Sequence, residues 1–190
     1  MLDSVLLSIA KTAILSKFDN TIEFDKEALF EKYPYLAQKG AVFVTLNQNS
    51  SLRGCIGSLV AHRELFDDIV HNAISAAFHD PRFTPLSEYD LKELQLEVSL
   101  LSEPKELSYI DFEDLKSKIT PFRDGLILRH GQYQGTFLPQ VWEQLPKVEQ
   151  FLEHLAYKAG ANPSIYAQHP QIFLYGVDKI SEKFDAVPSL

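Results

Sequence analysis

The sequence lacks several features that would place the protein in a specialised class. No apolar run approaches the ~20 residues that span a bilayer, and the chain contains a single cysteine, Cys55. A lone cysteine excludes any disulfide within the chain and fits a reducing compartment. Positive charge is also scarce, because 18 Lys+Arg against 26 Asp+Glu give 18 − 26 = −8. Nucleic-acid backbones and anionic membranes require a positive surface, so neither is expected as a partner.

The start of the chain does not resemble a secretory signal. The segment from Met1 to Phe18 carries an acid at Asp3 and has no basic beginning, whereas signal peptides begin with positive charge. Together with the single thiol, this predicts a cytoplasmic protein.

Motifs for metals and nucleotides are missing as well. There is no Cys-x-x-Cys, His-Glu-x-x-His, phosphate-loop or dinucleotide glycine pattern. His62 and His71 are nine residues apart and would point to opposite sides of a helix. Asp67 and His71, with Asp68 nearby, are expected on a solvated polar helix face rather than as metal ligands. No metal and no cofactor are therefore predicted.

What is present describes a globular chain with ample material for a core. Of the 190 residues 45% are apolar, and 13 Phe and 8 Tyr supply large side chains to bury. One compact domain, or two small lobes sharing a core, is expected at this length. No linker or internal repeat divides the chain, so residues 1–190 are predicted to form a single domain.

Hydrophobic periodicity and turn residues predict the secondary structure. Helices are expected over residues 2–14, 26–32, 64–78, 111–118 and 148–159, the last closed by Gly160. Strands are expected over residues 41–46, 52–60, 94–100, 125–129, 132–138 and 172–177. Hairpins interspersed with helices predict an α+β fold with a largely antiparallel sheet and flanking helices.

The segment Leu52-Arg-Gly-Cys-Ile-Gly57 is the first candidate for chemistry. Gly54 and Gly57 are unusual inside a strand and indicate a bulge or a close backbone approach. Cys55 between them has little side-chain cover, its neighbouring amides can receive an anion, and Arg53 can favour the thiolate. The alternative is that Cys55 is a small buried apolar residue.

Three further residue groups are candidates, each with a structural alternative. Within Asp80-Pro-Arg-Phe-Thr-Pro85, Arg82 offers a planar fork for a carboxylate or phosphate, unless it only pairs with Asp80. Glu97 can act as a general base or pair with an arginine, or it can lie on a solvated sheet face. His79 ends a helix, where the helix dipole alone can explain it.

The segment Leu52–Gly57 resembles the signature of the AMMECR domain family, whose prokaryotic members are called AmmeMemoRadiSam system protein A. Further blocks that resemble the family follow in family order and cover roughly residues 2–180. These are Ala41-Val-Phe-Val-Thr45, Asp80-Pro-Arg-Phe83, Leu96-Glu-Val-Ser-Leu-Leu101, Gly125-Leu-Ile-Leu128, Thr136-Phe-Leu-Pro-Gln-Val141 and Phe151-Leu-Glu-His-Leu155. The chain departs from the family pattern in a short stretch after Val141 and in Tyr166, near which a tryptophan is expected.

The resemblance implies an α+β fold with two lobes flanking a cleft. It places near that cleft the residues Arg53, Gly54, Cys55, Asp80, Arg82 and Glu97. It implies no defined reaction, but it implies an association with Memo-type and radical-SAM proteins.

Two functional hypotheses remain open at this point. In the first, slightly favoured one, the protein is an enzyme with Cys55 as nucleophile, Arg53 lowering the thiol pKa, Arg82 anchoring an acidic group, and Glu97 or His79 moving the proton. In the second, the protein binds a ligand or partner without catalysis. Cys55 is then packing, Gly54 and Gly57 permit close backbone contact, and Arg82 is the anchor.

Overall fold

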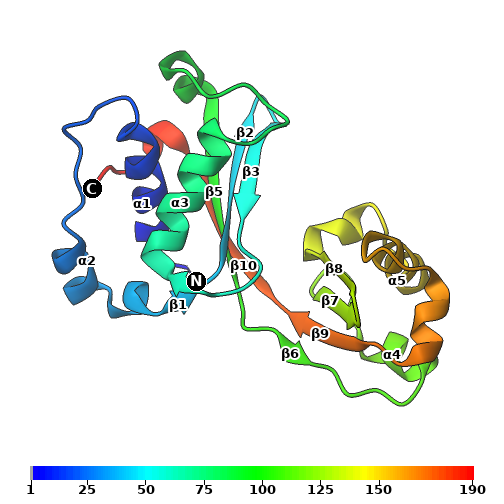
Figure 1. The fold of residues 1–190 in the computed structure, drawn as a ribbon. Coiled ribbons are helices and arrows are strands. Elements are labelled where there is room, and N and C mark those ends of the chain that lie inside the picture. The colour runs from blue at the N-terminus through cyan, green and yellow to red at the C-terminus, as the bar shows by residue number, and fades with distance from the viewer. Residues whose placement is uncertain (1) are drawn as a thin grey trace. The chain divides into compact units, whose positions relative to one another are not determined.

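A computed structural model describes residues 2–190 and confirms the α+β class, with antiparallel sheets and flanking helices (Figure 1). The chain divides into two compact units. Unit 1 comprises the chain as far as Leu101 together with Asp178–Leu190, and unit 2 comprises Ser102–Val177.

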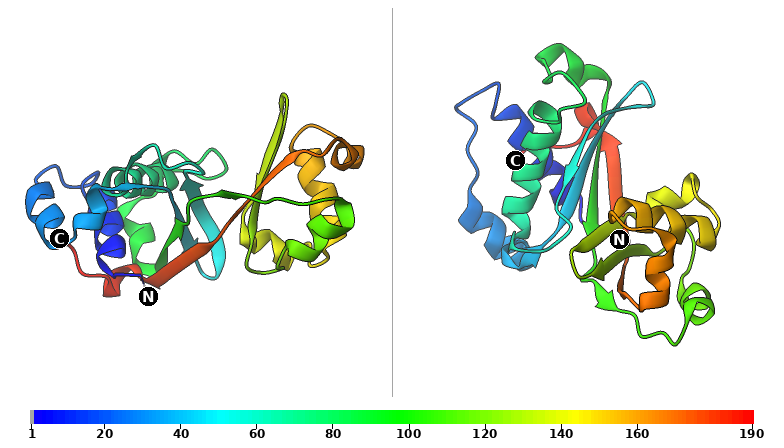
Figure 2. Two further views of the ribbon diagram at one scale, coloured as in Figure 1. Left: turned by 90° about the horizontal axis from the view of Figure 1, so that it is seen from below. Right: turned by 45° about the vertical axis from the view of Figure 1, so that its right-hand side comes forward.

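Unit 1 is built on a four-stranded sheet with one face covered by two helices. The strands lie in the order β10 (Val177–Lys183), β5 (Leu94–Leu101), β2 (Val42–Gln48) and β3 (Ser51–Gly57). The β5–β2 and β2–β3 pairs are antiparallel. Helices α1 (Val5–Leu15) and α3 (Leu65–Phe78) pack on the same face of this sheet (Figure 2). Unit 1 also contains α2 (Lys26–Lys32), whose first turn is capped by Asp25.

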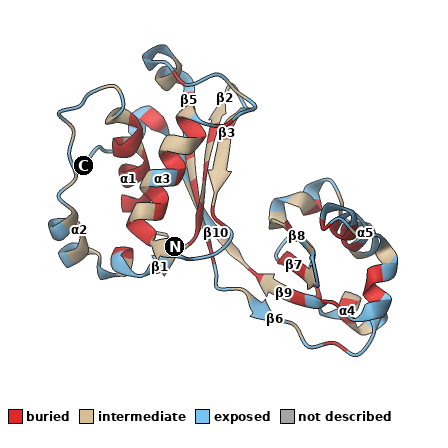
Figure 3. Ribbon diagram, in the orientation of Figure 1, coloured by how far each residue is buried: buried red, intermediate tan, exposed pale blue. Residues whose placement is uncertain are grey.

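The core of unit 1 follows from strand alternation and helical periodicity. Val42, Val44 and Leu46 on β2 are fully buried, whereas Phe43 and Thr45 between them are only half-buried. Figure 3 shows α1 buried along almost its whole length, whereas α3 alternates buried with half-buried and exposed residues. The second face of the sheet therefore carries the side chains that the core does not use.

Unit 2 has its own sheet and its own core. Its strands lie in the order β6 (Lys105–Glu106), β9 (Gln171–Tyr175), β7 (Gly125–His130) and β8 (Tyr133–Phe137), all antiparallel. Helices α4 (Phe112–Lys118) and α5 (Val148–Lys158) complete it. The core forms where α5 meets the sheet, and Trp142 is stacked on Phe151 at 3.7 Å between ring centroids.

Most of the predicted elements are present, and several details differ. The strand expected to reach Val60 ends at Gly57, and Leu59 and Val60 are exposed in the loop that follows. A small two-stranded sheet, β1 (Lys39–Gly40) with β4 (Arg63–Glu64), was not predicted. Strand β10 was also missed because it is mostly exposed and carries no clear apolar alternation.

The expectation for Asp68 was wrong. It lies on the buried side of α3 with no exposed surface, where it accepts hydrogen bonds from the Val42 backbone N–H, the Ser58 hydroxyl and the Asn72 amide. A carboxylate buried with this many donors is satisfied without solvent. Asp67, the neighbouring acid, does lie in the solvated position predicted for it and pairs with Lys26.

No helix within residues 2–190 is long and apolar enough to cross a membrane.

Candidate functional site

Three adjacent strands of unit 1 place a thiol, a hydroxyl and a carboxylate side by side. Thr45 on β2 is the direct cross-strand partner of Cys55 on β3 and of Glu97 on β5. Directly opposed residues in a sheet share one face, and this is the face turned away from α1 and α3. We call these three residues the Cys55 row. The Thr45 hydroxyl donates a hydrogen bond to Cys55 Sγ at 3.3 Å.

The far end of the Cys55 row is charged. The Glu97 side chain is only 19% exposed, and its Oε2 lies 3.7 Å from Nζ of Lys179 on β10. The alternative interpretation placed Glu97 on a solvated sheet face. A carboxylate with this little exposure does not fit that interpretation. Glu97 is instead held in an ion pair at the edge of the row.

The other end of the row is fixed by the loop after α3, which replaces a missing neighbouring strand. Strand β3 lies at the sheet edge, so the backbone of Cys55 lacks a strand partner on its outer side. Asp80 Oδ2 accepts a hydrogen bond from the Cys55 backbone N–H at 2.9 Å, and Arg82 Nη2 donates to the Cys55 carbonyl at 3.1 Å. The two side chains therefore satisfy both backbone groups of Cys55, as a fifth strand would.

Asp80 and Arg82 form one rigid pair, which we call the edge clamp. Arg82 Nε and Nη2 donate to Asp80 Oδ1 and Oδ2 at 2.9 and 2.7 Å. This bidentate geometry holds the pKa of the Asp80 carboxyl well below its usual range. The ion pair between Arg82 and Asp80, which was the structural interpretation of Arg82, is thus present. The binding of a carboxylate or phosphate by Arg82 stays a prediction. Arg82 is 53% exposed, and no hydrogen bond to its Nη1 is found within residues 2–190.

Burial decides the acidity of the Cys55 thiol. Burial raises its pKa, while the hydrogen bond from Thr45 and the charge of Arg82 act in the opposite direction. Arg53, expected to lower this pKa, points elsewhere: its guanidinium donates to the Thr84 carbonyl at 2.7 Å and lies 3.7 Å from Asp90. Arg82 takes the place that the sequence argument gave to Arg53.

The two glycines are explained by close approaches inside unit 1. A Cβ atom on Gly54 would lie 2.1 Å from the backbone carbonyl oxygen of Ala76 on α3. A Cβ atom on Gly57 would lie within 2.3 Å of the Phe43 ring. The close backbone approach predicted for this strand therefore exists, and at Gly54 it is made to a helix.

Replacing Gly54 by alanine is expected to lower the free energy of unfolding. The added methyl cannot be accommodated by a side-chain rotation because it meets backbone atoms, and overpacking of this kind costs about 1–3 kcal/mol. Urea unfolding followed by circular dichroism measures the loss. Gly176→Ala is the matched control, since its Cβ would approach only Ser102 Oγ, at 3.7 Å. Equal stability of the two variants would contradict the interpretation.

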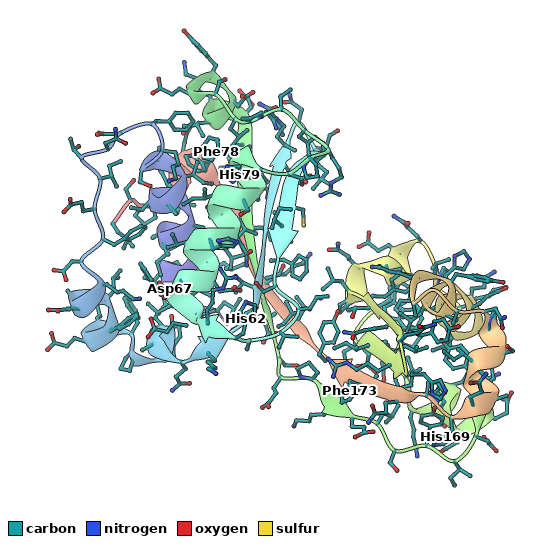
Figure 4. The ribbon with its side chains drawn as sticks, in the orientation of Figure 1. His62, Asp67, Phe78, His79, His169 and Phe173 are labelled. Atoms are coloured by element: carbon teal, nitrogen blue, oxygen red, sulfur yellow. The ribbon has the colours of Figure 1, made fainter. Side chains whose placement is uncertain are left out.

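His79 is not drawn into the Cys55 row. It is exposed at the end of α3, where its backbone N–H bonds to the Ser75 carbonyl (Figure 4). Within residues 2–190 no hydrogen bond or ion pair joins its ring to Cys55 or Glu97. Its proposed role as a proton carrier gains no support from this geometry.

Two residues of the site were not singled out from the sequence. Thr45 gave no signal beyond its place in a strand, although strand register alone puts it between Cys55 and Glu97. Lys179 lay in the unpredicted strand β10. A hairpin register assigned across residues 42–57 would have identified Thr45.

Known proteins match this chain over most of its length. The family model described as AMMECR1 matches residues 7–180. Protein Mbar_A1807 of Methanosarcina barkeri is 36% identical over 160 residues, which cover 83% of this chain and 78% of that protein. A protein of Sulfolobus acidocaldarius is 36% identical over 171 residues, covering 85% and 72%.

A solved structure has the same fold. The uncharacterised protein PH0010 of Pyrococcus horikoshii superposes with a TM-score of 0.82 at 31% sequence identity. The match covers 97% of this chain and 93% of PH0010. Family match, sequence identity and fold agree, and the chain belongs to the AMMECR1 family, whose biochemical function is undefined.

Proposed function

We propose that unit 1 is a binding module for a small polar ligand with an anionic group, seated on the Cys55 row beside Arg82. The observation that carries the proposal is the alignment of a hydroxyl, a thiol and a carboxylate on the sheet face that the core leaves free. Arg82 supplies the anion anchor, because Nη1 remains available while its other nitrogens are held in the edge clamp. A preorganised arginine binds an oxyanion without first losing side-chain freedom.

Binding is favoured over covalent chemistry by the state of the thiol. A cysteine nucleophile needs a lowered pKa or a base within hydrogen-bond reach. Burial instead raises the pKa of Cys55, and the neighbour bonded to its Sγ is a hydroxyl that donates. Glu97 is separated from Cys55 by the intervening strand β2.

The alkylation of Cys55 tests the proposal, because the single thiol makes intact mass unambiguous. The measured quantity is the ratio of the alkylation rate with iodoacetate to the rate with neutral iodoacetamide. We expect this ratio to be about threefold to fivefold higher for Cys55 than for a free thiol, a difference of about 0.7–1 kcal/mol that one exposed charge supplies. Arg82→Gln should remove this difference, whereas Lys179→Gln should keep most of it. We expect the pH midpoint of labelling to lie above the free-thiol value of about 8.5. If the ratio of the iodoacetate rate to the iodoacetamide rate in the native protein equals that of a free thiol, Arg82 does not act as an anion anchor.

A second candidate, a cysteine enzyme, is favoured by one observation. The Thr45 hydroxyl and the Arg82 charge both act to stabilise a thiolate at Cys55. A labelling midpoint well below about 8.5 would support it over the binding module. Thr45→Val should then raise that midpoint, since the hydroxyl donor is lost while the side-chain shape is kept.

The family resemblance supplies a candidate context. We propose that the protein acts together with Memo-type and radical-SAM proteins, on the basis of the name given to prokaryotic members of the family. Failure of purified partners to form a complex at micromolar concentration would count against a stable assembly.

A further inference from the structure

Arg129 occupies the sheet face of unit 2 that its core does not use. On β7, Leu126 and Leu128 point into the core beneath α5. Alternation places Ile127 and Arg129 on the opposite face. The direct cross-strand partners of Arg129 are Gln134 on β8 and Gln171 on β9, which share this face.

Arg129 differs from the other arginines of the chain in having no partner. The sequence contains arginine at positions 53, 63, 82, 123 and 129. Each of the first four lies within ion-pair distance of an aspartate. Within residues 2–190 the Arg129 guanidinium makes no hydrogen bond or ion pair, and its Nε is buried without a partner. A protein with an excess of acids thus leaves one arginine unneutralised.

Burying the Arg129 Nε donor without an acceptor costs free energy, and a ligand that accepts from the guanidinium would recover part of this cost. Removing a guanidinium N–H from water without a replacement acceptor is unfavourable. The Arg129 guanidinium carbon lies over the ring of Phe173 on β9 (labelled in Figure 4), 5.1 Å from the ring centroid. This contact holds the guanidinium in place and leaves its hydrogen-bond donors unused.

The surroundings describe a site with room for more than an ion. Gln134 and Gln171 are exposed and bring amide groups to both sides of Arg129, so a ligand can approach from solvent. Gln171 also lines a hollow of about 340 Å³, together with Glu106, Tyr109 and His169. The rings of Tyr109 and His169 stack at 4.2 Å and form a flat wall of that hollow.

We propose that Arg129 anchors the carboxylate of a small organic acid, with the rest of the molecule lying toward the hollow. The planar fork of arginine matches a carboxylate with two parallel hydrogen bonds. One guanidinium balances one negative charge, and Glu106, which accepts a hydrogen bond from Gln171 at 3.1 Å, disfavours a doubly charged phosphate. The inference goes beyond the proposed function, because Arg129 lies in unit 2 and the Cys55 row in unit 1.

Titration with benzoate, a monocarboxylate, followed by amide NMR shifts along β7 and β9, tests the site. We expect saturable shifts with a dissociation constant of about 1 mM or tighter. Arg129→Gln should weaken binding at least about tenfold, Arg129→Lys should retain part of it, and Arg123→Gln should leave it unchanged. Inorganic phosphate should compete poorly, and neutral benzamide should not bind.

Stability provides an independent readout of the same idea. Arg129→Met removes the unsatisfied donor and keeps the apolar stem, so its melting temperature should equal or exceed that of the native protein while benzoate binding is lost. Shifts that stay linear in benzoate concentration, or binding that survives in Arg129→Gln, would overturn the proposal. Tighter binding of phosphate than of benzoate would overturn the carboxylate assignment.

Discussion

Asp68→Ala is expected to lower the free energy of unfolding by about 3–5 kcal/mol, the cost of removing one member of a buried ionic network. The variant leaves the Val42 backbone N–H, the Ser58 hydroxyl and one Asn72 donor without their acceptor. It also deprives Arg63, whose Nε lies 3.3 Å from Asp68 Oδ1, of its counter-charge. Such a loss is a large part of the ~5–15 kcal/mol that stabilises a typical domain.

Urea unfolding by circular dichroism measures this loss, and hydrogen exchange of peptides from β2 locates it in unit 1. Asp67→Ala is the control, because it removes the adjacent acid from the same helix. Its pairing with Lys26 is solvated on both sides, so its expected cost is below about 1 kcal/mol. A difference of less than about 1 kcal/mol between the two variants would contradict the buried-network interpretation.

Asp80→Asn is expected to cost about 1.5–3 kcal/mol at neutral pH, because it removes the charge from a buried carboxylate that a half-exposed arginine holds with two hydrogen bonds. The amide oxygen can still accept from the Cys55 backbone N–H, so the strand edge stays paired, but Arg82 loses its counter-ion. The loss of clamp rigidity should also speed alkylation of Cys55. Glu113→Gln is the matched control, since it makes the same carboxylate-to-amide change in an ion pair with Lys116 whose acid is 80% exposed.

The Asp80 effect should depend on pH with a defined sign. The Asp80 pKa is lowered in the folded protein, chiefly by the hydrogen bonds from Arg82. Its stabilising contribution is therefore complete above the unfolded-state pKa of about 3.9 and is lost as the pH falls below that value. The stability difference between native protein and Asp80→Asn should be constant from pH 7 to about pH 5 and shrink below about pH 4. A difference that grows on acidification would contradict this assignment.

The local elements of the fold could be predicted because short-range chemistry fixes them. Asp25 caps α2, and Ser87 with Asp90 forms a capping box. The turn at His130-Gly131 adopts the left-handed backbone that glycine permits, as does Gly160 after α5. These features depend on residues a few positions apart, and the sequence displays them directly.

The sequence predicted several residues of the candidate site but not the contacts that each of them makes. Cys55, Asp80 and Arg82 do lie together, as the family resemblance implied, yet the hydrogen bonds between them run through the Cys55 backbone. Arg53 lies two positions from Cys55, and regular strand alternation would place both side chains on one face. A β-bulge in β3 leaves Arg53 without a cross-strand partner, and its guanidinium turns to Thr84 and Asp90. Thr45 was missed because it lies ten positions from Cys55 and meets it only across the sheet.

The sequence by itself determined the family, the α+β class, most helices and hairpins, and the segment around Cys55. Only the tertiary structure decided which polar groups are buried and which partners they find. Asp68 and Asp67 are adjacent acids on one helix, and the sequence treats them alike. Packing against β2 makes one a buried acceptor and leaves the other in solvent. Free energies of polar groups depend on desolvation and on donors brought from distant segments, and both arise only when the chain is folded.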